Sequence, residues 1–197
     1  MPKQVDHHDR RQRIAEAVWR IAADRGLEAA SMSAVAVEAG VSIGLIQHYF
    51  DSKDQLVVFA AAQLRERIDR RVQDQLAAAP EPRTPMTLLR ATLTALLPLT
   101  SEDRTVALAG VAVFIRALHE PTLTTQYRRG HTQLAAALAG QIAAAARAGE
   151  LRADLDPGIE ASILAALVSG LASDLLLGAC PPARAAAMIE RHLEHLR

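Results

Sequence analysis

The sequence is poor in cysteine and in aromatic residues, and it has no excess of either charge. Its single cysteine, Cys180, excludes an internal disulfide and a cysteine-based metal cluster, and it favours a reducing compartment. Aromatic residues make up only 3% of a chain that is 50% hydrophobic, so we expect a core of Ala, Leu, Val and Ile. The 22 basic and 22 acidic side chains cancel, and the chain as a whole therefore has no general attraction for nucleic acid.

Long uninterrupted apolar runs are also scarce. The N-terminal segment "MPKQVDHHDRRQRI" lacks the apolar stretch of a signal peptide. The longest apolar-rich segment, residues 161–179, is interrupted by three serines and by Asp174, which favours a buried helix over a membrane span. We therefore expect a cytoplasmic protein that does not contact a membrane.

Helical periodicity dominates what remains, and the strand-like alternation of apolar and polar residues is nearly absent. Ser31 or Ser33 is suited to cap a second helix, Ser42 a third and Ser52 a long fourth. The sequence thus predicts an all-α fold of about nine helices. The first is expected to begin near Asp9, and the later ones to lie near residues 86–97, 102–118, 122–148, 157–177 and after 181.

Domain organisation follows from prolines and from a tight turn. Pro80, Pro82 and Pro85 mark a connector that ends the long fourth helix. We expect a three-helix domain with a helix-turn-helix in residues 1–54, and a helical domain for ligand binding and dimerisation in residues 55–197.

The stretch "AGVSIGLIQHYFDSKDQL", residues 39–56, predicts two short helices joined by a turn at Gly40, which adopts positive φ without steric cost. A helix, a glycine turn and a second helix form the geometry that places one helix in the major groove of DNA. Ile43 is suited to a thymine methyl group, and Gln47 to a base edge or a phosphate. The predicted small core is Val35, Ala36, Val41, Ile46 and Phe50.

The segments "RIAEAVWRIAADRGLEAAS" and "SMSAVAVEAGVSIGLIQHYFDSKDQL" together resemble the DNA-binding signature of the tetracycline-repressor (TetR) family of bacterial regulators. The segment "RAGELRADLDPGIEASILAALVSGLASDLLLG" resembles a pattern of the penultimate helices in that family. "GLIQHYF" and "EPTLTTQYRRGH" are similar to the betaine-pathway repressor branch.

This resemblance implies a homodimer that binds a palindromic DNA operator and holds an unknown small-molecule effector, without a cofactor. By the same resemblance, Tyr49 and Lys53 contact phosphates. The full predicted DNA-binding set is Ser31, Ser33, Ser42, Ile43, Gly44, Gln47, His48, Tyr49 and Lys53.

The predicted DNA-binding domain does not carry a net positive charge. Residues 1–54 contain seven basic and eight acidic side chains, a net charge of −1. A DNA-binding surface needs a basic patch, which must here be local. The candidates are Lys3, Arg10, Arg11 and Lys53, with His7, His8 and His48 adding charge at lower pH.

Effector binding and dimerisation are predicted for the C-terminal part. Small side chains around Ala109 and Gly110 leave room for an apolar ligand, which Arg116, His119 or Tyr127 would orient. Apolar stripes on the last two helices predict a four-helix bundle between two copies. The interface residues expected are Leu164, Leu167, Val168, Leu171, Leu175, Met188, Ile189, His192 and Leu196.

Two other classes of protein compete with a ligand-controlled regulator. One is an architectural or partner-binding DNA-associated protein without a small ligand, which a filled C-terminal part would favour. The other is an enzyme, for which the sequence offers no nucleophile–base pair and no phosphate loop. His192 and His195 have a spacing that suits two metal ligands but lack a third, so we predict no metal site.

Overall fold

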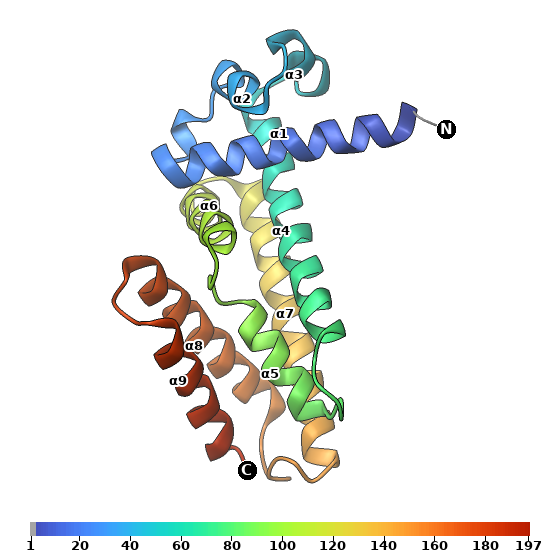
Figure 1. Cartoon of the computed structure of the whole chain (residues 1–197), viewed down its shortest axis with the longest axis vertical. Coiled ribbons are helices and arrows are strands. Elements are labelled where there is room, and N and C mark those ends of the chain that lie inside the picture. Colours follow the sequence, from blue (N-terminus) through green and yellow to red (C-terminus); the bar gives the residue numbers. More distant parts are fainter. Residues whose placement is uncertain (1–2) are drawn as a thin grey trace. The chain divides into compact units, whose positions relative to one another are not determined.

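The computed structural model describes residues 3–197, and side chains from Asp9 onward, as nine α-helices and one short 3-10 helix without strands (Figure 1). The predicted all-α class is confirmed. The first helix begins at Lys3 rather than at Asp9, and the side chains of Lys3, His7 and His8 lie outside the described residues. The helices are α1 (Lys3–Arg25), α2 (Met32–Ala39), α3 (Ile43–Tyr49), α4 (Lys53–Ala77), α5 (Pro85–Ala95), α6 (Ser101–Ala117), α7 (Pro121–Arg147), α8 (Pro157–Leu177) and α9 (Pro182–His195), with the 3-10 helix η1 (Leu27–Ala29) after α1.

The chain packs as two compact units. Unit 1 comprises Met1–Arg67 and Arg104–Tyr127, and unit 2 comprises Ile68–Asp103 and Arg128–Arg197. This division differs from the predicted boundary after residue 54, because the first part of α4 and most of α6 pack with the N-terminal helices. Each unit has its own apolar core.

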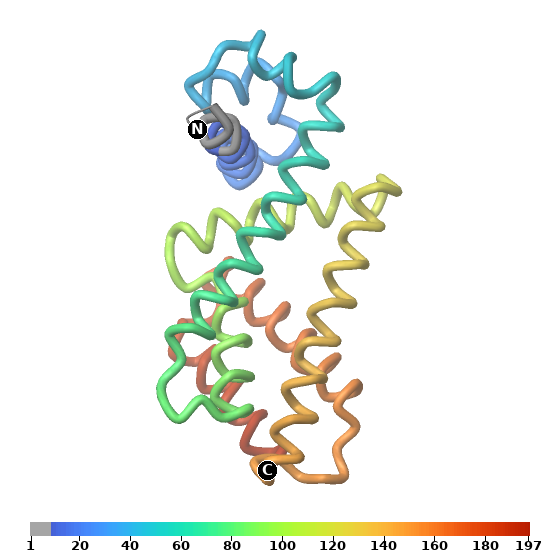
Figure 2. Tube along the Cα trace, turned by 90° about the vertical axis from the view of Figure 1, so that its right-hand side faces the viewer, coloured from blue at the N-terminus to red at the C-terminus, as the bar shows by residue number. Residues whose placement is uncertain are grey.

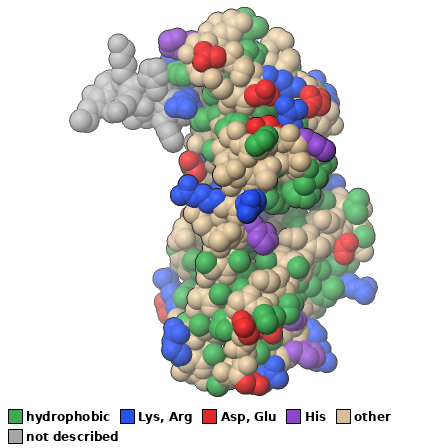
Figure 3. Space-filling model, turned by 180° about the vertical axis from the view of Figure 1, so that it is seen from behind, with side chains coloured by type: hydrophobic (Ala, Val, Ile, Leu, Met, Phe, Trp, Pro, Cys, Tyr) green, Lys and Arg blue, Asp and Glu red, His purple; other side chains and the backbone are tan. Residues whose placement is uncertain are grey.

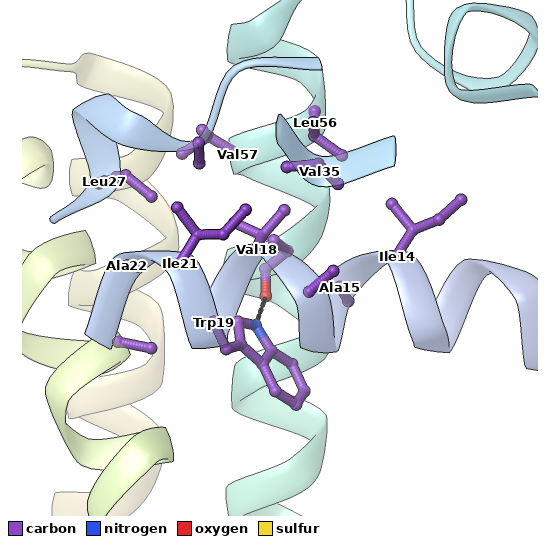
Figure 4. Close-up of a cluster of buried hydrophobic side chains, with 14 of the residues drawn as sticks. Ile14, Ala15, Val18, Trp19, Ile21, Ala22, Leu27, Val35, Leu56 and Val57 are labelled. Carbon is purple, nitrogen blue, oxygen red and sulfur yellow. Dashed lines mark hydrogen bonds between the residues drawn. The ribbon is translucent and has the colours of Figure 1, made fainter. Parts of the chain in front are cut away.

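The core of unit 1 forms between α1 and the helices around it. Ile14, Val18 and Ile21 of α1 are almost fully buried and face side chains of α2 and α4 (Figure 4). The Trp19 indole Nε1–H donates a hydrogen bond to the Ala60 carbonyl at 2.9 Å, so its one polar group is satisfied. Figures 1 and 2 both show α2 and α3 on the same side of α1.

Local capping produces the helix-turn-helix. The Ser31 side chain accepts from the Ala34 N–H, and the Ser42 side chain accepts from the Leu45 N–H, each at 3.2 Å. Gly40 ends α2 with φ of 67°, a conformation that costs glycine little. Of the predicted small core, Val35, Ala36, Ile46 and Phe50 are buried and Val41 is partly buried, as expected. Caps and core together hold α3 at a fixed angle to α2.

Unit 2 contains the last part of α4, most of α7, and the helices α5, α8 and α9. Leu138 and Ile142 of α7, one helical turn apart, are fully buried. An ion pair of 2.5 Å between Arg90 and Glu190 joins α5 to α9. His192 Nε2 of α9 lies 3.7 Å from Glu160 Oε2 of α8, and the described residues contain no group of three side chains that could hold a metal.

Most of the side chains predicted for the dimer interface are buried within the single chain. Leu164, Val168 and Leu171 of α8 and Ile189 and Leu196 of α9 are each at most 4% exposed, because they form the core of unit 2 within one chain. Side chains that are already buried have no surface to offer a second copy. Leu167, Leu175 and His192 are partly buried, and Met188 alone of the set is exposed.

The outer face of α8 is the exposed one. It carries small or apolar side chains and a shallow groove lined by Asp156, Gly158, Ile159, Ser162, Ile163 and Ala166. Among the described helices, α8 is also the one long and apolar enough to cross a membrane. The core helix of a soluble protein can have the same composition, and one face of α8 is buried in the core of unit 2.

Candidate DNA-binding site

The outer surface of α2 and α3 carries most of the predicted DNA-binding residues. Ser31, Ser33, Ser42, Gly44, Gln47 and His48 are all exposed, and the Ile43 side chain is 47% exposed. A Cβ atom added to Gly44 would meet only Ser42 Oγ, at 4.0 Å. The chain itself therefore leaves open space at Gly44, and the small residue permits close approach of an outside molecule to α3.

Tyr49 lies at the edge of this surface rather than on it. It is partly buried, with its ring 5.5 Å from the His48 ring and 6.3 Å from the Phe50 ring. Arg11, one of the predicted basic residues, stacks its guanidinium over the Phe59 ring at 4.6 Å. This contact links α1 to α4 and fixes where that charge lies.

Lys53 is the first residue of α4, and its ammonium group is held by Glu28. Nζ donates to the Glu28 carbonyl at 2.9 Å and to Glu28 Oε2 at 3.0 Å. The hydrogen bond from Lys53 and its charge lower the pKa of the Glu28 carboxyl below its usual value. The cation predicted to bind phosphate is thus already paired within its own chain.

The three predicted effector residues have different surroundings. The Arg116 guanidinium binds Glu28 Oε1 at 3.3 Å and Asp54 Oδ1 at 3.1 Å, so it joins the end of α6 to η1 and to the start of α4. Its role in the structure is to bridge elements of unit 1. His119 is exposed. Tyr127 is 46% exposed and packs its ring 5.1 Å from that of Phe114, while partial burial raises the pKa of its hydroxyl.

Two residues near the candidate site, Glu28 and Val37, were not included in the sequence-based prediction. Glu28 was missed because its partners Lys53 and Arg116 lie 25 and 88 residues away, and no local pattern connects them. Val37 is 83% exposed, the highest value among the large hydrophobic side chains described. Its signal was present in the sequence: Val37 follows the inward pair Val35 and Ala36, so helical geometry turns it outward.

The charge on one face of the molecule is mixed (Figure 3). On the face seen in Figure 3, Lys and Arg side chains are interspersed with Asp and Glu, and they form no continuous basic area. An attraction for DNA on this face would depend on individual cations, whose pairing within the chain therefore matters.

Known proteins provide an independent comparison. Residues 14–58 match the profile described as "Bacterial regulatory proteins, tetR family", and residues 85–197 match "BetI-type transcriptional repressor, C-terminal". The HTH-type transcriptional regulator PksA of Bacillus subtilis is 33% identical over 90% of this chain and 83% of its own length.

Solved structures agree with these matches. A transcriptional regulator from Rhodococcus sp. Rha1 superposes with a TM-score of 0.78 at 28% identity, over 94% of this chain and 95% of its own. A transcriptional regulator from Saccharomonospora viridis, solved in complex with choline, has a TM-score of 0.78 at 24% identity, with 95% of both chains covered. The helix-turn-helix, the two profiles and the full-length relatives together establish that this chain belongs to the TetR family of bacterial transcriptional regulators, with a C-terminal part of the BetI type.

Proposed function

We propose that the protein is a dimeric repressor that reads a palindromic operator with α3 and leaves it when a small effector binds. The observation that carries this proposal is the exposed face of α3, where Ile43, Gly44 and Gln47 lie together on a helix fixed by its cap and by a buried core. Ile43 offers an apolar contact to a thymine methyl group, and Gln47 offers a donor and an acceptor to a base edge. Residues 1–54 form the DNA-binding domain in this proposal, and the protein acts in the cytoplasm.

Phosphate contacts position α3 without reading sequence. Lys53 stands at the start of a 25-residue helix, where its charge and the N-terminal end of the helix both attract a phosphate. His48 of α3 and Ser42, the residue that caps α3, are both exposed and would supply further hydrogen bonds. Val37 would contact the sugar–phosphate backbone through its methyl groups.

The dimer would form through the outer face of α8, in place of the stripe predicted from sequence. Gly158, Ser162, Ala166 and Gly170 recur every four residues along this face, and all four are exposed. Rows of small side chains with this spacing allow two helices to approach closely. Ile159, Ile163 and Leu177, which are 59%, 42% and 81% exposed, would bury apolar surface against the second copy.

The effector would bind in the C-terminal part of the chain, residues 55–197, which in this proposal also forms the dimer. Tyr127 and Phe114 present two exposed rings there, suited to an apolar or cationic group. A second candidate contact lies in unit 2. Gln141 Nε2 donates to Thr92 Oγ1, and because the Thr92 hydroxyl hydrogen goes to the Leu88 carbonyl, Gln141 Oε1 is left buried without a donor. An effector with an N–H or O–H group would satisfy it.

Footprinting of the purified protein on the DNA upstream of its own gene tests the proposed function. We expect protection of a two-fold symmetric site, and release of that protection by one member of a panel of small apolar and cationic metabolites. Protection of a site without two-fold symmetry would contradict the proposal that a dimer binds the operator with two copies of α3. Protection that no stabilising metabolite releases would favour the architectural alternative.

A further inference from the structure

The ammonium group of Lys53, the proposed contact for an operator phosphate, is already paired with Glu28 in the DNA-free chain. An ammonium has three hydrogens to donate. Two of them point to the carbonyl and to the carboxylate of Glu28, at 2.9 and 3.0 Å. The third hydrogen remains for a phosphate oxygen, but a phosphate that accepts it must approach the negative charge of Glu28, which competes with it for the same cation.

We propose that Glu28 is an internal competitor of the operator phosphate for Lys53, and that Arg116 sets how strongly it competes. This inference rests on the phosphate contact proposed for Lys53. The Glu28 carboxylate thereby weakens operator binding, and removal of its charge strengthens that binding.

The exposure of Glu28 allows a phosphate to compete successfully with it for Lys53. The Glu28 side chain is 78% exposed, so water can replace Lys53 around its carboxylate at little cost. Ion pairs exposed to this extent change an equilibrium by about two- to five-fold. A phosphate group can therefore displace Glu28, and the carboxylate reduces the affinity without preventing binding.

Arg116 acts on the other oxygen of the same carboxylate. Its Nη1 binds Glu28 Oε1 at 3.3 Å, while its Nη2 binds Asp54 Oδ1 at 3.1 Å. Because Arg116 shares the negative charge of Glu28, it weakens the hold of Glu28 on Lys53. Arg116 lies in the last turn of α6, so a displacement of that turn would change how available Lys53 is to DNA.

Four chains test the competition: wild type, Glu28→Gln, Arg116→Gln and the double variant. Their affinity for one operator duplex, obtained by selection with the wild-type protein, is measured by fluorescence anisotropy at a fixed low salt concentration. Glutamine keeps the size of each exposed side chain approximately and removes its charge, and thermal melts verify that each variant is folded. Asp24→Asn is the matched control, because it removes one exposed negative charge of unit 1 whose ion pair is with Arg25.

We expect Glu28→Gln to tighten operator binding about two- to five-fold, and Asp24→Asn to change it by less. Arg116→Gln should weaken binding in the wild-type background and have a markedly smaller effect in the Glu28→Gln background, because its action passes through Glu28. Equal effects of Arg116→Gln in both backgrounds would overturn the role of Arg116. Binding of Glu28→Gln no tighter than that of Asp24→Asn would overturn the competition.

A fifth chain, Lys53→Gln, separates this inference from the proposed function. If Lys53→Gln binds the operator as tightly as the wild type, the competition is refuted while operator binding stands. If the wild type selects no duplex at all, the proposed function fails and the inference falls with it.

Discussion

The indole Nε1–H of Trp19 donates a hydrogen bond to the carbonyl oxygen of Ala60 at 2.9 Å, across 41 residues of sequence. Trp19 is 5% exposed and belongs to α1, while Ala60 lies two turns into α4. This bond fastens the helix that supports α2 and α3 to the helix that begins with Lys53. The surface proposed to read DNA and the proposed phosphate contact Lys53 are therefore both attached to the packed core of unit 1.

Replacement of Trp19 by Phe should destabilise the protein by about 1–3 kcal/mol, from the lost hydrogen bond and from incomplete filling of the space. Urea unfolding followed by circular dichroism measures the change. Trp19 is the single tryptophan of the chain, so its fluorescence in the wild type reports the same packing. An unchanged urea midpoint would show that the bond contributes nothing to stability.

Lys53→Gln should weaken operator binding and reduce the slope of log K against log salt concentration by about 0.9, the contribution of one phosphate contact. Sequence preference should not change, because phosphate contacts do not read bases. Arg83→Gln, which removes a cation of unit 2, is the matched control and should leave the slope as in the wild type. If Lys53→Gln has the same salt slope as the wild type, Lys53 does not contact a phosphate.

Gln47→Ala and Ile43→Ala should each alter the preferred base at one position of the half-site, with a loss of discrimination of about 1–3 kcal/mol for a contact that reaches a base edge. The measurement is selection from a duplex library with each variant. A uniform loss of affinity, with the same preferred sequence, would assign that side chain to the backbone instead.

Ala166→Glu should produce folded monomers, because Ala166 lies on the exposed face of α8 and its replacement places charge in the proposed dimer contact. Leu171→Glu should instead unfold unit 2, since Leu171 is 2% exposed within its core. Light scattering reports the mass of each variant, and circular dichroism its folding. Dimers of Ala166→Glu with wild-type affinity would move the interface to another surface.

The Glu28 carboxyl should titrate below its usual pKa of 4.5 in the DNA-free protein, and it should return toward that value in Lys53→Gln. A depressed folded-state pKa means that the contact stabilises the protein above pH 4.5, and that this stabilisation is lost as the pH falls through the lowered pKa. Carbon-detected NMR of the side-chain carboxyl measures the value directly. Titration of Glu28 at 4.5 in the wild type would show that the Lys53 contact is not populated in solution.

Local chemistry explains which parts of the fold were predictable. Ser31, Ser42 and Gly40 act on backbone groups within a few residues of themselves, so their caps and the turn could be read directly from sequence. The inward positions Ile46 and Phe50 followed from helical spacing.

The remainder depends on tertiary packing. Helix α8 is apolar on nearly all sides, so periodicity could not tell the face that packs within the chain from the face left exposed. Leu164 and Leu171 were assigned to a second copy on apolarity alone, while the smaller Ala166 on the outer face carried no such signal. The Lys53–Glu28 pair was inaccessible for a different reason, because charge pairing between distant segments has no periodic pattern.

Selection of bound duplexes from a randomised DNA library, with the wild-type protein, tests the central claim most directly. Two copies that each place one α3 in the major groove should enrich a two-fold symmetric motif. The centres of its half-sites should lie one helical turn of about 10–10.5 base pairs, or a multiple of it, apart. Enrichment of such a motif, lost in the monomeric Ala166→Glu variant, is the result that we predict. A library that remains unenriched, or a motif without symmetry, would contradict the account.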